Sequence, residues 1–233
     1  MSDKRLRTTA RNNGVIHQEG IFNQIRISGV IEEEFEYSHQ TQWMRYYKTR
    51  VRVKRLSGTE DYVPIIVSEM LIANISEASL KGRYVEAEGQ FRSFNKLGED
   101  GRKHLELFLF ATAFTIQESE EESDANLIYL DGYICMPPIF RVTPLGRKIT
   151  DLMVIVYRKY DKYDNIPCIA WGEIAQYASE LKIADRIKLY GRVQSRRYFK
   201  KSSPDSDEGE YKTAYEISIT RMKKVQGKSS DDK

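Results

Sequence analysis

Residues 186–198 read RIKLYGRVQSRRY, and residues 83–94 read RYVEAEGQFRSF. Both stretches are rich in residues that favour β-strands, and each contains one interior glycine, Gly191 in the first and Gly89 in the second. A glycine inside a strand indicates a bulge or a sharp bend. The two glycines lie 102 residues apart (191 − 89), which indicates that one glycine-bent strand occurs twice in the chain.

Two further landmarks repeat in nearly the same register. Gly29 and Gly132 each follow a β-prone run, and they lie 103 residues apart (132 − 29). Pro64 and Pro167 each precede an apolar run, again 103 residues apart (167 − 64). Three landmarks in one register predict two copies of a single module of about 100 residues, a common domain size.

Polar segments mark the boundaries of the two copies. Residues 117–124 contain no apolar residue and are mostly acidic, which is typical of a solvated linker. Both ends of the chain are polar and are expected to be disordered. The predicted organisation is a disordered arm over 1–19, a diverged first domain over 20–117, an acidic linker over 118–125, a second domain over 126–225 and a short disordered tail over 226–233.

Each copy has the pattern of a small β-barrel. Residues 49–56 alternate apolar and basic side chains, and residues 152–157 form a continuous β-prone run. A helical stretch precedes each glycine-bent strand, over 70–79 in the first copy and 173–181 in the second. We therefore predict a mainly β chain of two tandem OB-fold barrels, each a five-stranded Greek key with one short helix between strands three and four.

The composition bounds the class of protein. The 233 residues carry 37 Lys+Arg and 34 Asp+Glu, a formal net charge of +3. No apolar run approaches the roughly 20 residues of a membrane helix, and the basic N-terminus lacks the apolar stretch of a signal peptide. Two cysteines make neither a disulfide framework nor a four-cysteine zinc site. We expect a cytoplasmic protein.

The sequence also lacks the patterns typical of enzymes. Its three histidines, His17, His39 and His104, are not spaced with Cys, Asp or Glu as metal ligands would be. The glycine-rich phosphate-binding motifs and the nucleophile-elbow motif are missing from it. We expect no catalytic residues, no bound metal and no cofactor.

Five fragments of the second copy, in order, carry a resemblance to a known family. They are NLIYLDG at 126–132, RVTPLG at 141–146, LMVIVYR at 152–158, IPCIAWGEIA at 166–175 and YGRVQSRRY at 190–198. In this order and spacing the second copy resembles a bacterial single-stranded DNA-binding protein over nearly its whole length. The first copy is more diverged, and its assignment rests mainly on the repeat.

The resemblance implies a function and an assembly. It implies sequence-tolerant binding and protection of single-stranded DNA in replication, recombination or repair, hence an association with the nucleoid. The tandem chain resembles the double-barrel variants of the family, for which a homodimer would present four barrels. The family's acidic tail tip with its aromatic end has no counterpart here, so we do not expect the tail to recruit repair proteins.

Binding single strands without sequence preference needs cations for phosphates and aromatic faces for bases. The second copy combines both along its arginine-rich fourth strand. Trp171 follows an apolar run, so a core position is the alternative to base stacking, and the resemblance favours stacking. The candidates in this copy are Tyr157, Arg158, Trp171, Arg192, Arg196, Arg197, Tyr198, Phe199 and Lys200.

In the first copy a basic stripe, Lys48, Arg50, Arg52 and Lys54, shares one strand face. Four cations without an acid between them on that face favour a phosphate track, although such a stripe is more often a solvated strand face. Trp43 lies in a polar loop, and it either contacts a ligand or packs under the loop. The other candidates in this copy are Tyr46, Tyr62, Arg92 and Phe94.

Two other functions fit the same barrels, because fold alone does not fix function. One is a primosomal or plasmid-transfer adaptor whose barrels mainly contact proteins. The other is a single-stranded RNA-binding protein.

Overall fold

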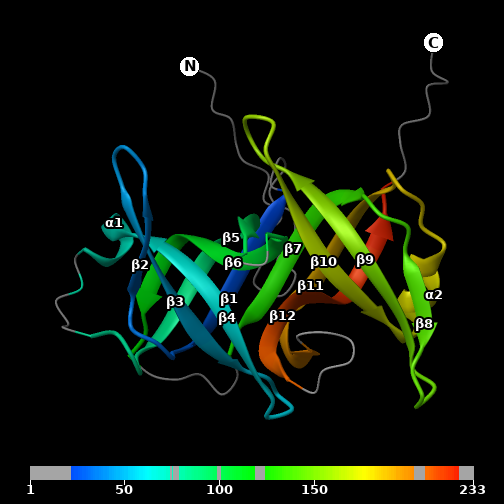
Figure 1. Ribbon diagram of the computed structural model, residues 1–233, viewed down its shortest axis with the longest axis horizontal. Helices are drawn as coiled ribbons and strands as arrows, with labels where there is room; N and C mark the ends of the chain where they lie inside the picture. Colours follow the sequence, from blue (N-terminus) through cyan, green and yellow to red (C-terminus); the bar gives the residue numbers. More distant parts are fainter. Residues whose placement is uncertain are drawn as a thin grey trace, which may run out of the picture.

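A computed structural model describes residues 22–73, 75, 79–98, 101–118, 124–201 and 208–225, without the side chains of Lys200 and Lys201. The predicted arm over 1–19 and tail over 226–233 lie outside the described residues, as does most of the predicted linker. Figure 1 shows two β-barrels side by side.

The first barrel is built from β1 (Asn23–Ile31), β2 (Glu36–Gln40), β3 (Arg45–Lys54), β4 (Glu60–Ser68), α1 (Glu69–Ile72), β5 (Tyr84–Leu97) and β6 (Lys103–Ile116). The strands pair in the order β3-β4-β6-β5-β1, and a second pairing of β1 with β3 closes the barrel. The pairing of β4 with β6 is parallel, whereas the other pairings are antiparallel. β2 extends the sheet outside the closed barrel, because it pairs with β3.

The second barrel repeats this order with β7 (Asn126–Ile134), β8 (Ile139–Val142), β9 (Lys148–Tyr157), β10 (Tyr163–Trp171), α2 (Gly172–Ser179), β11 (Arg186–Lys201) and β12 (Gly209–Lys224). β7, β9, β10, β12 and β11 close the barrel, and β8 lies outside it against β9. The predicted fold class is thereby confirmed: two five-stranded barrels, each with a helix between its third and fourth strands.

Two features of the fold differ from the sequence prediction. The short strands β2 and β8 were not predicted, because nearly all their residues are exposed and give no alternation of apolar and polar side chains. The first helix covers Glu69–Ile72 rather than 70–79. The helix ends at Ile72 with Ala73 as its C-cap, and residues 74 and 76–78 lie outside the described residues.

Each interior glycine lies at an irregularity of its strand, as predicted. The β5–β6 register shifts between Glu88 and Gly89, and the β11–β12 register shifts between Tyr190 and Gly191. A Cβ atom built on Gly191 would lie 2.5 Å from the carbonyl oxygen of Ser218 on the neighbouring strand. The sharp bend of β11 therefore depends on the absence of a side chain at this position.

Replacing Gly191 with alanine is expected to destabilise the protein by roughly 1–3 kcal/mol, as other overpacked cores are. The physical reason is that the added methyl group meets strand backbone, which can move only if the β11–β12 ladder shifts. Denaturant unfolding of the wild type and of Gly191→Ala measures the effect. Equal free energies of unfolding would show that the bend does not require glycine.

The two barrels join through their first strands. β1 and β7 pair antiparallel, so that both barrels belong to one twelve-stranded sheet. Ile25 lies opposite Ile128, and these two residues are equivalent positions of the repeat. The pairing is therefore symmetric about this point, as at the two-fold axis of an isologous dimer. The acidic segment is thus not the only connection between the barrels.

Candidate nucleic-acid interface

An arginine–aromatic ladder lies on the outer half of the β11–β12 hairpin. The guanidinium carbon of Arg196 lies 5.7 Å from the ring centre of Tyr198, and that of Arg197 lies 4.7 Å from the ring centre of Tyr211. Phe199 packs edge-to-face on Tyr211 at 5.3 Å between ring centres. All five side chains are exposed. A base stacked here would meet both an aromatic face and a cation.

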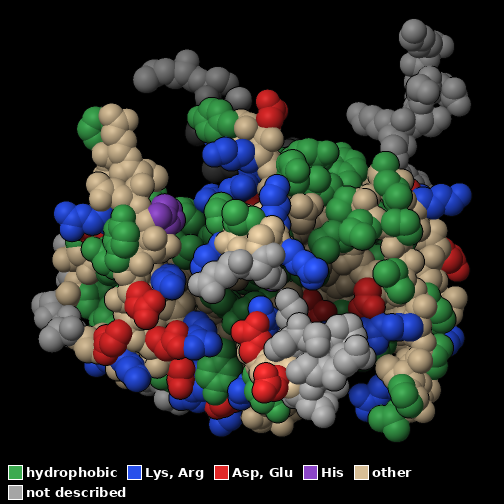
Figure 2. All heavy atoms as spheres, in the orientation of Figure 1, with side chains coloured by type: hydrophobic (Ala, Val, Ile, Leu, Met, Phe, Trp, Pro, Cys, Tyr) green, Lys and Arg blue, Asp and Glu red, His purple; other side chains and the backbone are tan. Residues whose placement is uncertain are grey.

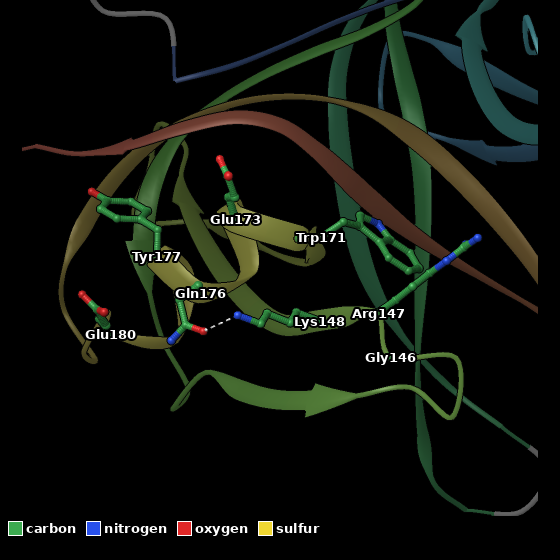
Figure 3. Close-up of a pocket in the computed structure, with 9 residues that line it drawn as sticks. Gly146, Arg147, Lys148, Trp171, Glu173, Gln176, Tyr177 and Glu180 are labelled. Atoms are coloured by element: carbon green, nitrogen blue, oxygen red, sulfur yellow. Dashed lines mark hydrogen bonds between the residues drawn. The ribbon is translucent and has the colours of Figure 1, made fainter.

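Trp171 lines an open pocket of about 940 Å³ at the end of β10. Arg147 and Lys148, from the β8–β9 turn and the start of β9, line the same pocket, and Lys148 donates a 3.3 Å hydrogen bond to Gln176 of α2. Figure 3 shows Arg147 and Trp171 at one end of the pocket, with Tyr177 at the other. The half-exposed indole and the two cations suit a nucleotide, with its base on the ring and its phosphate near Arg147.

The β9–β10 hairpin carries three exposed tyrosines, of which the sequence analysis selected only Tyr157. Tyr163 pairs with Tyr157 across the hairpin, and Tyr160 lies in the turn with 90% of its surface exposed. Tyr160 and Asp161 have positive φ angles of 61° and 52°, a conformation that costs a non-glycine residue about 1–3 kcal/mol. Figure 2 shows hydrophobic, basic and acidic side chains together on this projection. A tyrosine in so strained and exposed a place suggests contact with a ligand.

The first barrel has an aromatic stack that crosses three strands. His39 of β2 lies parallel to Tyr46 of β3 at 4.7 Å, and Tyr46 is tilted against Phe110 of β6 at 5.5 Å. The guanidinium of Arg92 lies 3.9 Å from the ring centre of Phe110. The structure thus brings together the predicted Tyr46 and Arg92, and it adds His39 and Phe110. Trp43, 84% exposed in the nearby β2–β3 loop, does not pack under that loop.

Three of the four cations of the basic stripe on β3 are paired with acids from neighbouring segments. Lys48 lies 3.2 Å from Glu36, Arg50 donates two hydrogen bonds to Glu33, and Arg52 donates to Glu32 and Glu60. The bond to Glu33 raises the pKa of Arg50, and the same pair lowers the pKa of Glu33. Figure 2 shows acidic and basic side chains interleaved over β3 and β4. Phosphate binding by the stripe stays a prediction, and at Lys48, Arg50 and Arg52 it requires the phosphate to displace a glutamate.

Three predicted arginines lie where the barrels meet. Arg158 makes an ion pair with the buried Asp164, at 3.1 Å. Burial, together with the nearby Arg158, lowers the pKa of Arg92, and burial together with the nearby Arg55 lowers the pKa of Arg192. The charges of Asp164 near Arg92 and of Asp61 near Arg192 act in the opposite direction. A guanidinium that is half-buried beside another cation gains from an added anion.

The remaining candidates are dispersed. Tyr62 points its hydroxyl at Glu60, to which it donates a 3.1 Å hydrogen bond, beside Arg52. Phe94 and Lys54 are exposed on β5 and β3. The side chain of Lys200 lies outside the described residues. Tyr62, Phe94 and Lys54 are not brought into one site with the clusters above.

Asp164 gives the folded protein a distinctive dependence on pH. Its burial raises the pKa above the ordinary 3.8, although a hydrogen bond from the Ser93 N–H and the charge of Arg158 act in the opposite direction. Just above pH 3.8 the folded state consequently holds more protons than the unfolded state, so this group lowers the free energy of unfolding as pH rises.

Asp164→Asn is expected to remove that contribution. Over about pH 4 to 6, the free energy of unfolding of the variant should rise more steeply, or fall less steeply, with pH than that of the wild type. Denaturant unfolding at several pH values measures both slopes. Parallel curves would mean that Asp164 titrates alike in the folded and unfolded states.

The described residues form neither a metal site nor a membrane-spanning helix. No three His, Cys, Asp or Glu side chains among those residues gather as a metal site would require. Among the helices that the structure describes, none has the length and apolar character needed to cross a membrane.

Known structures share the whole architecture. A deletion and point variant of the single-stranded DNA-binding protein from Thermus aquaticus superimposes with a TM-score of 0.71 at 18% sequence identity, over 91% of this chain and 98% of that one. This protein has the fold of the Thermus aquaticus single-stranded DNA-binding protein. The wild-type Thermus aquaticus protein gives a TM-score of 0.67 at 19% identity, over 89% and 95% of the two chains.

A third structure is the N-terminal domain of PriB from Thermoanaerobacter tencongensis, at 30% identity over 42% of this chain and 98% of that one, with a TM-score of 0.36. No protein-family model and no curated protein match the sequence. The likeness to the Thermus aquaticus protein covers both barrels, so the tandem arrangement is part of the shared fold.

Proposed function

We propose that this protein binds single-stranded DNA without strong sequence preference and protects it during replication, recombination or repair. The observation that carries the proposal is the arginine–aromatic ladder of β11 and β12, in which Arg196 and Arg197 lie over exposed tyrosine rings. Stacking is sequence-tolerant because every base has a π-face, and cations beside the rings meet the phosphates.

The other clusters extend this binding surface. In our proposal Trp171 stacks one base in its pocket while Arg147 meets a phosphate, and the tyrosines of the β9–β10 hairpin contact further bases. In the first barrel Tyr46, Phe110 and Arg92 serve the same purpose. The likeness to the Thermus aquaticus protein supports the assignment at the level of fold.

Self-association as a homodimer that presents four barrels belongs to the same proposal. The edge strand β8 exposes three apolar side chains, Ile139, Phe140 and Val142, and nothing in the described part of the chain pairs with its outer edge. Light scattering of the free protein tests this part, and a monomeric mass would contradict it.

The decisive experiment compares three labelled nucleic acids by fluorescence anisotropy: poly-dT, poly-U and duplex DNA, all at one salt concentration. Quenching of the two tryptophans provides a second readout. We expect the tightest binding to poly-dT. Equal affinity for duplex DNA would contradict the proposal, tighter binding of poly-U would favour the RNA-binding alternative, and no binding would favour the protein-adaptor alternative.

A further inference from the structure

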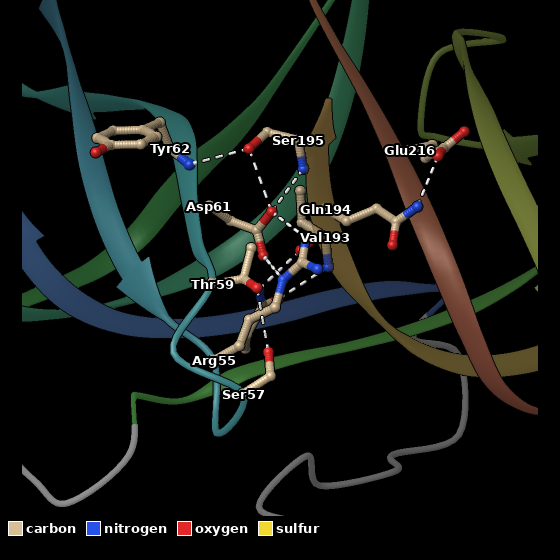
Figure 4. Close-up of polar contacts among 10 residues, drawn as sticks. Arg55, Ser57, Thr59, Asp61, Tyr62, Val193, Gln194, Ser195 and Glu216 are labelled. Atoms are coloured by element: carbon tan, nitrogen blue, oxygen red, sulfur yellow. Dashed lines mark hydrogen bonds and ion pairs between the residues drawn. The ribbon is translucent and has the colours of Figure 1, made fainter. Parts of the chain in front are cut away.

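Two buried aspartates reach from one barrel to the other. Asp61 of β4 accepts hydrogen bonds from the backbone N–H and the hydroxyl of Ser195 on β11, at 2.7 and 3.2 Å. Asp164 of β10 accepts a 2.8 Å hydrogen bond from the backbone N–H of Ser93 on β5. Both aspartates are 0% exposed. We call each aspartate–serine contact a latch, and Figure 4 shows the one at Asp61.

The two latches are equivalent under the repeat. Asp61 and Asp164 are 103 residues apart (164 − 61), and Ser93 and Ser195 are 102 apart (195 − 93). Each latch has a second bond in the opposite direction. The Tyr62 N–H donates to the Ser195 hydroxyl at 3.3 Å, and the N–H of Asn165 donates to the Ser93 hydroxyl at 2.9 Å. A contact that recurs at both equivalent positions belongs to a two-fold interface.

Each latch satisfies a backbone group that its own barrel leaves unpaired. The β7–β11 ladder ends at Gly191, and the Asn126 side chain then bonds both backbone groups of Val193. Two residues further, Ser195 pairs with Tyr215 of β12 on one edge of β11, but in the described part of its own barrel no strand pairs with the other edge, where Asp61 of the other barrel accepts the Ser195 N–H. A buried N–H without a partner is costly, so the extended strand is held against the opposite barrel.

Arginines fix the aspartates in turn. Arg55 donates hydrogen bonds to both oxygens of Asp61 at 2.6 Å, whereas Arg158 forms an ion pair with Asp164 at 3.1 Å without a hydrogen bond between these atoms. Both arginines belong to the same barrel as the aspartate that they hold. Each carboxylate thus contacts an arginine of its own barrel and accepts a hydrogen bond from the backbone of the other barrel. The two contacts lie on either side of the β1–β7 pairing.

We propose that Asp61 and Asp164 are positioning residues that hold the two barrels at one fixed orientation, so that a single nucleic-acid strand crossing the junction meets both binding surfaces in register. This inference rests on the proposed function. Fixed geometry raises the effective concentration of the second surface once the first is occupied. The latches should therefore matter for long strands and not for strands that fit one barrel.

The test measures the affinity of the full chain for oligo-dT of two lengths, about 8 and about 35 nucleotides, since one OB barrel covers roughly 4–16 nucleotides. In the double variant Asp61→Ala/Asp164→Ala we expect the short strand to bind as to wild type and the long strand to bind about tenfold more weakly. Asp61→Asn/Asp164→Asn keeps an acceptor for each serine N–H and should restore long-strand binding.

Asp131→Ala is the matched control. Asp131 is also buried and bonded through both oxygens to an arginine, Arg186, at 2.8 and 3.0 Å, but this pair lies within the second barrel. We expect the ratio of long-strand to short-strand affinity to stay at the wild-type value in this variant. An unchanged ratio in the double alanine variant, or an equal loss in the control, would overturn the inference.

Small-angle X-ray scattering without DNA provides a readout that does not depend on the proposed function. The double alanine variant should give a broader distribution of interatomic distances than the wild type, whereas Asp131→Ala should not. If the wild type binds no DNA, the proposed function fails while scattering still decides whether the latches hold the barrels. If the double variant does not fold, the single variant Asp164→Ala takes its place. An unchanged distribution contradicts the inference.

Discussion

Raising the NaCl concentration from about 50 to about 200 mM is expected to weaken binding of poly-dT by about 300-fold. The reason is counterion release: each phosphate that the protein neutralises contributes a slope of about −0.7 to the logarithmic salt dependence of single-strand binding. Arg92, Arg147, Arg192, Arg196 and Arg197 with Lys148 give about six such contacts. Anisotropy titrations at four or more salt concentrations measure the slope.

Two variants sharpen the salt experiment. Arg196→Ala should reduce the magnitude of the slope by about 0.7, since we assign that side chain a phosphate contact. Arg50→Ala should leave the slope nearly unchanged, because Arg50 is bonded to Glu33. If Arg50→Ala strongly reduces the magnitude of the slope, the phosphates follow β3 instead. If the affinity of the wild type does not depend on salt, phosphate binding is contradicted altogether.

Trp171→Ala and Tyr198→Ala are each expected to weaken binding of oligo-dT by roughly 1–3 kcal/mol, the usual contribution of one stacked base. Trp171 is half-exposed beside two cations, and Tyr198 lies under Arg196. Leu56→Ala is the control, since Leu56 is an exposed apolar residue in the β3–β4 turn outside every cluster. Its removal should not alter binding.

The same variants must be examined by thermal unfolding. Tyr198 is on an exposed hairpin extension, so its replacement should leave the melting temperature almost unchanged. Trp171 lies at the junction of β10 and α2. A modest decrease of the melting temperature of Trp171→Ala is therefore compatible with a role in binding. If either variant loses cooperative unfolding and shows no separate defect in binding, that residue belongs to the core and not to the interface.

The sequence was sufficient to predict the repeat, the two barrels and both glycine bends, because these depend on local patterns. Gly89 and Gly191 occur within β-prone runs, and the spacing of 102 residues links them. The short edge strands were missed, since exposed residues such as those of β8 carry no periodic signal.

The candidate site was less predictable because it depends on contacts between distant segments. Arg50 has no acid beside it on its own strand face, yet Glu33 from the β1–β2 connection reaches it. His39 and Phe110 join Tyr46 only because β2 and β6 lie near β3 in the barrel. For Tyr160 a signal was present, since residues 157–163 read YRKYDKY, a run of aromatics and cations.

The symmetric pairing of β1 with β7 has a consequence for the direction in which a strand can lie. A dimer of identical barrels presents the same surface on both sides of its axis, so it cannot distinguish a bound strand from the same strand reversed. Here the equivalent of Trp171 is Ser68, and the equivalent of Tyr46 is Ile149. The two barrels of this chain therefore present unlike surfaces, and a pair of unlike surfaces is able to hold a strand that crosses the junction with a defined 5′-to-3′ polarity.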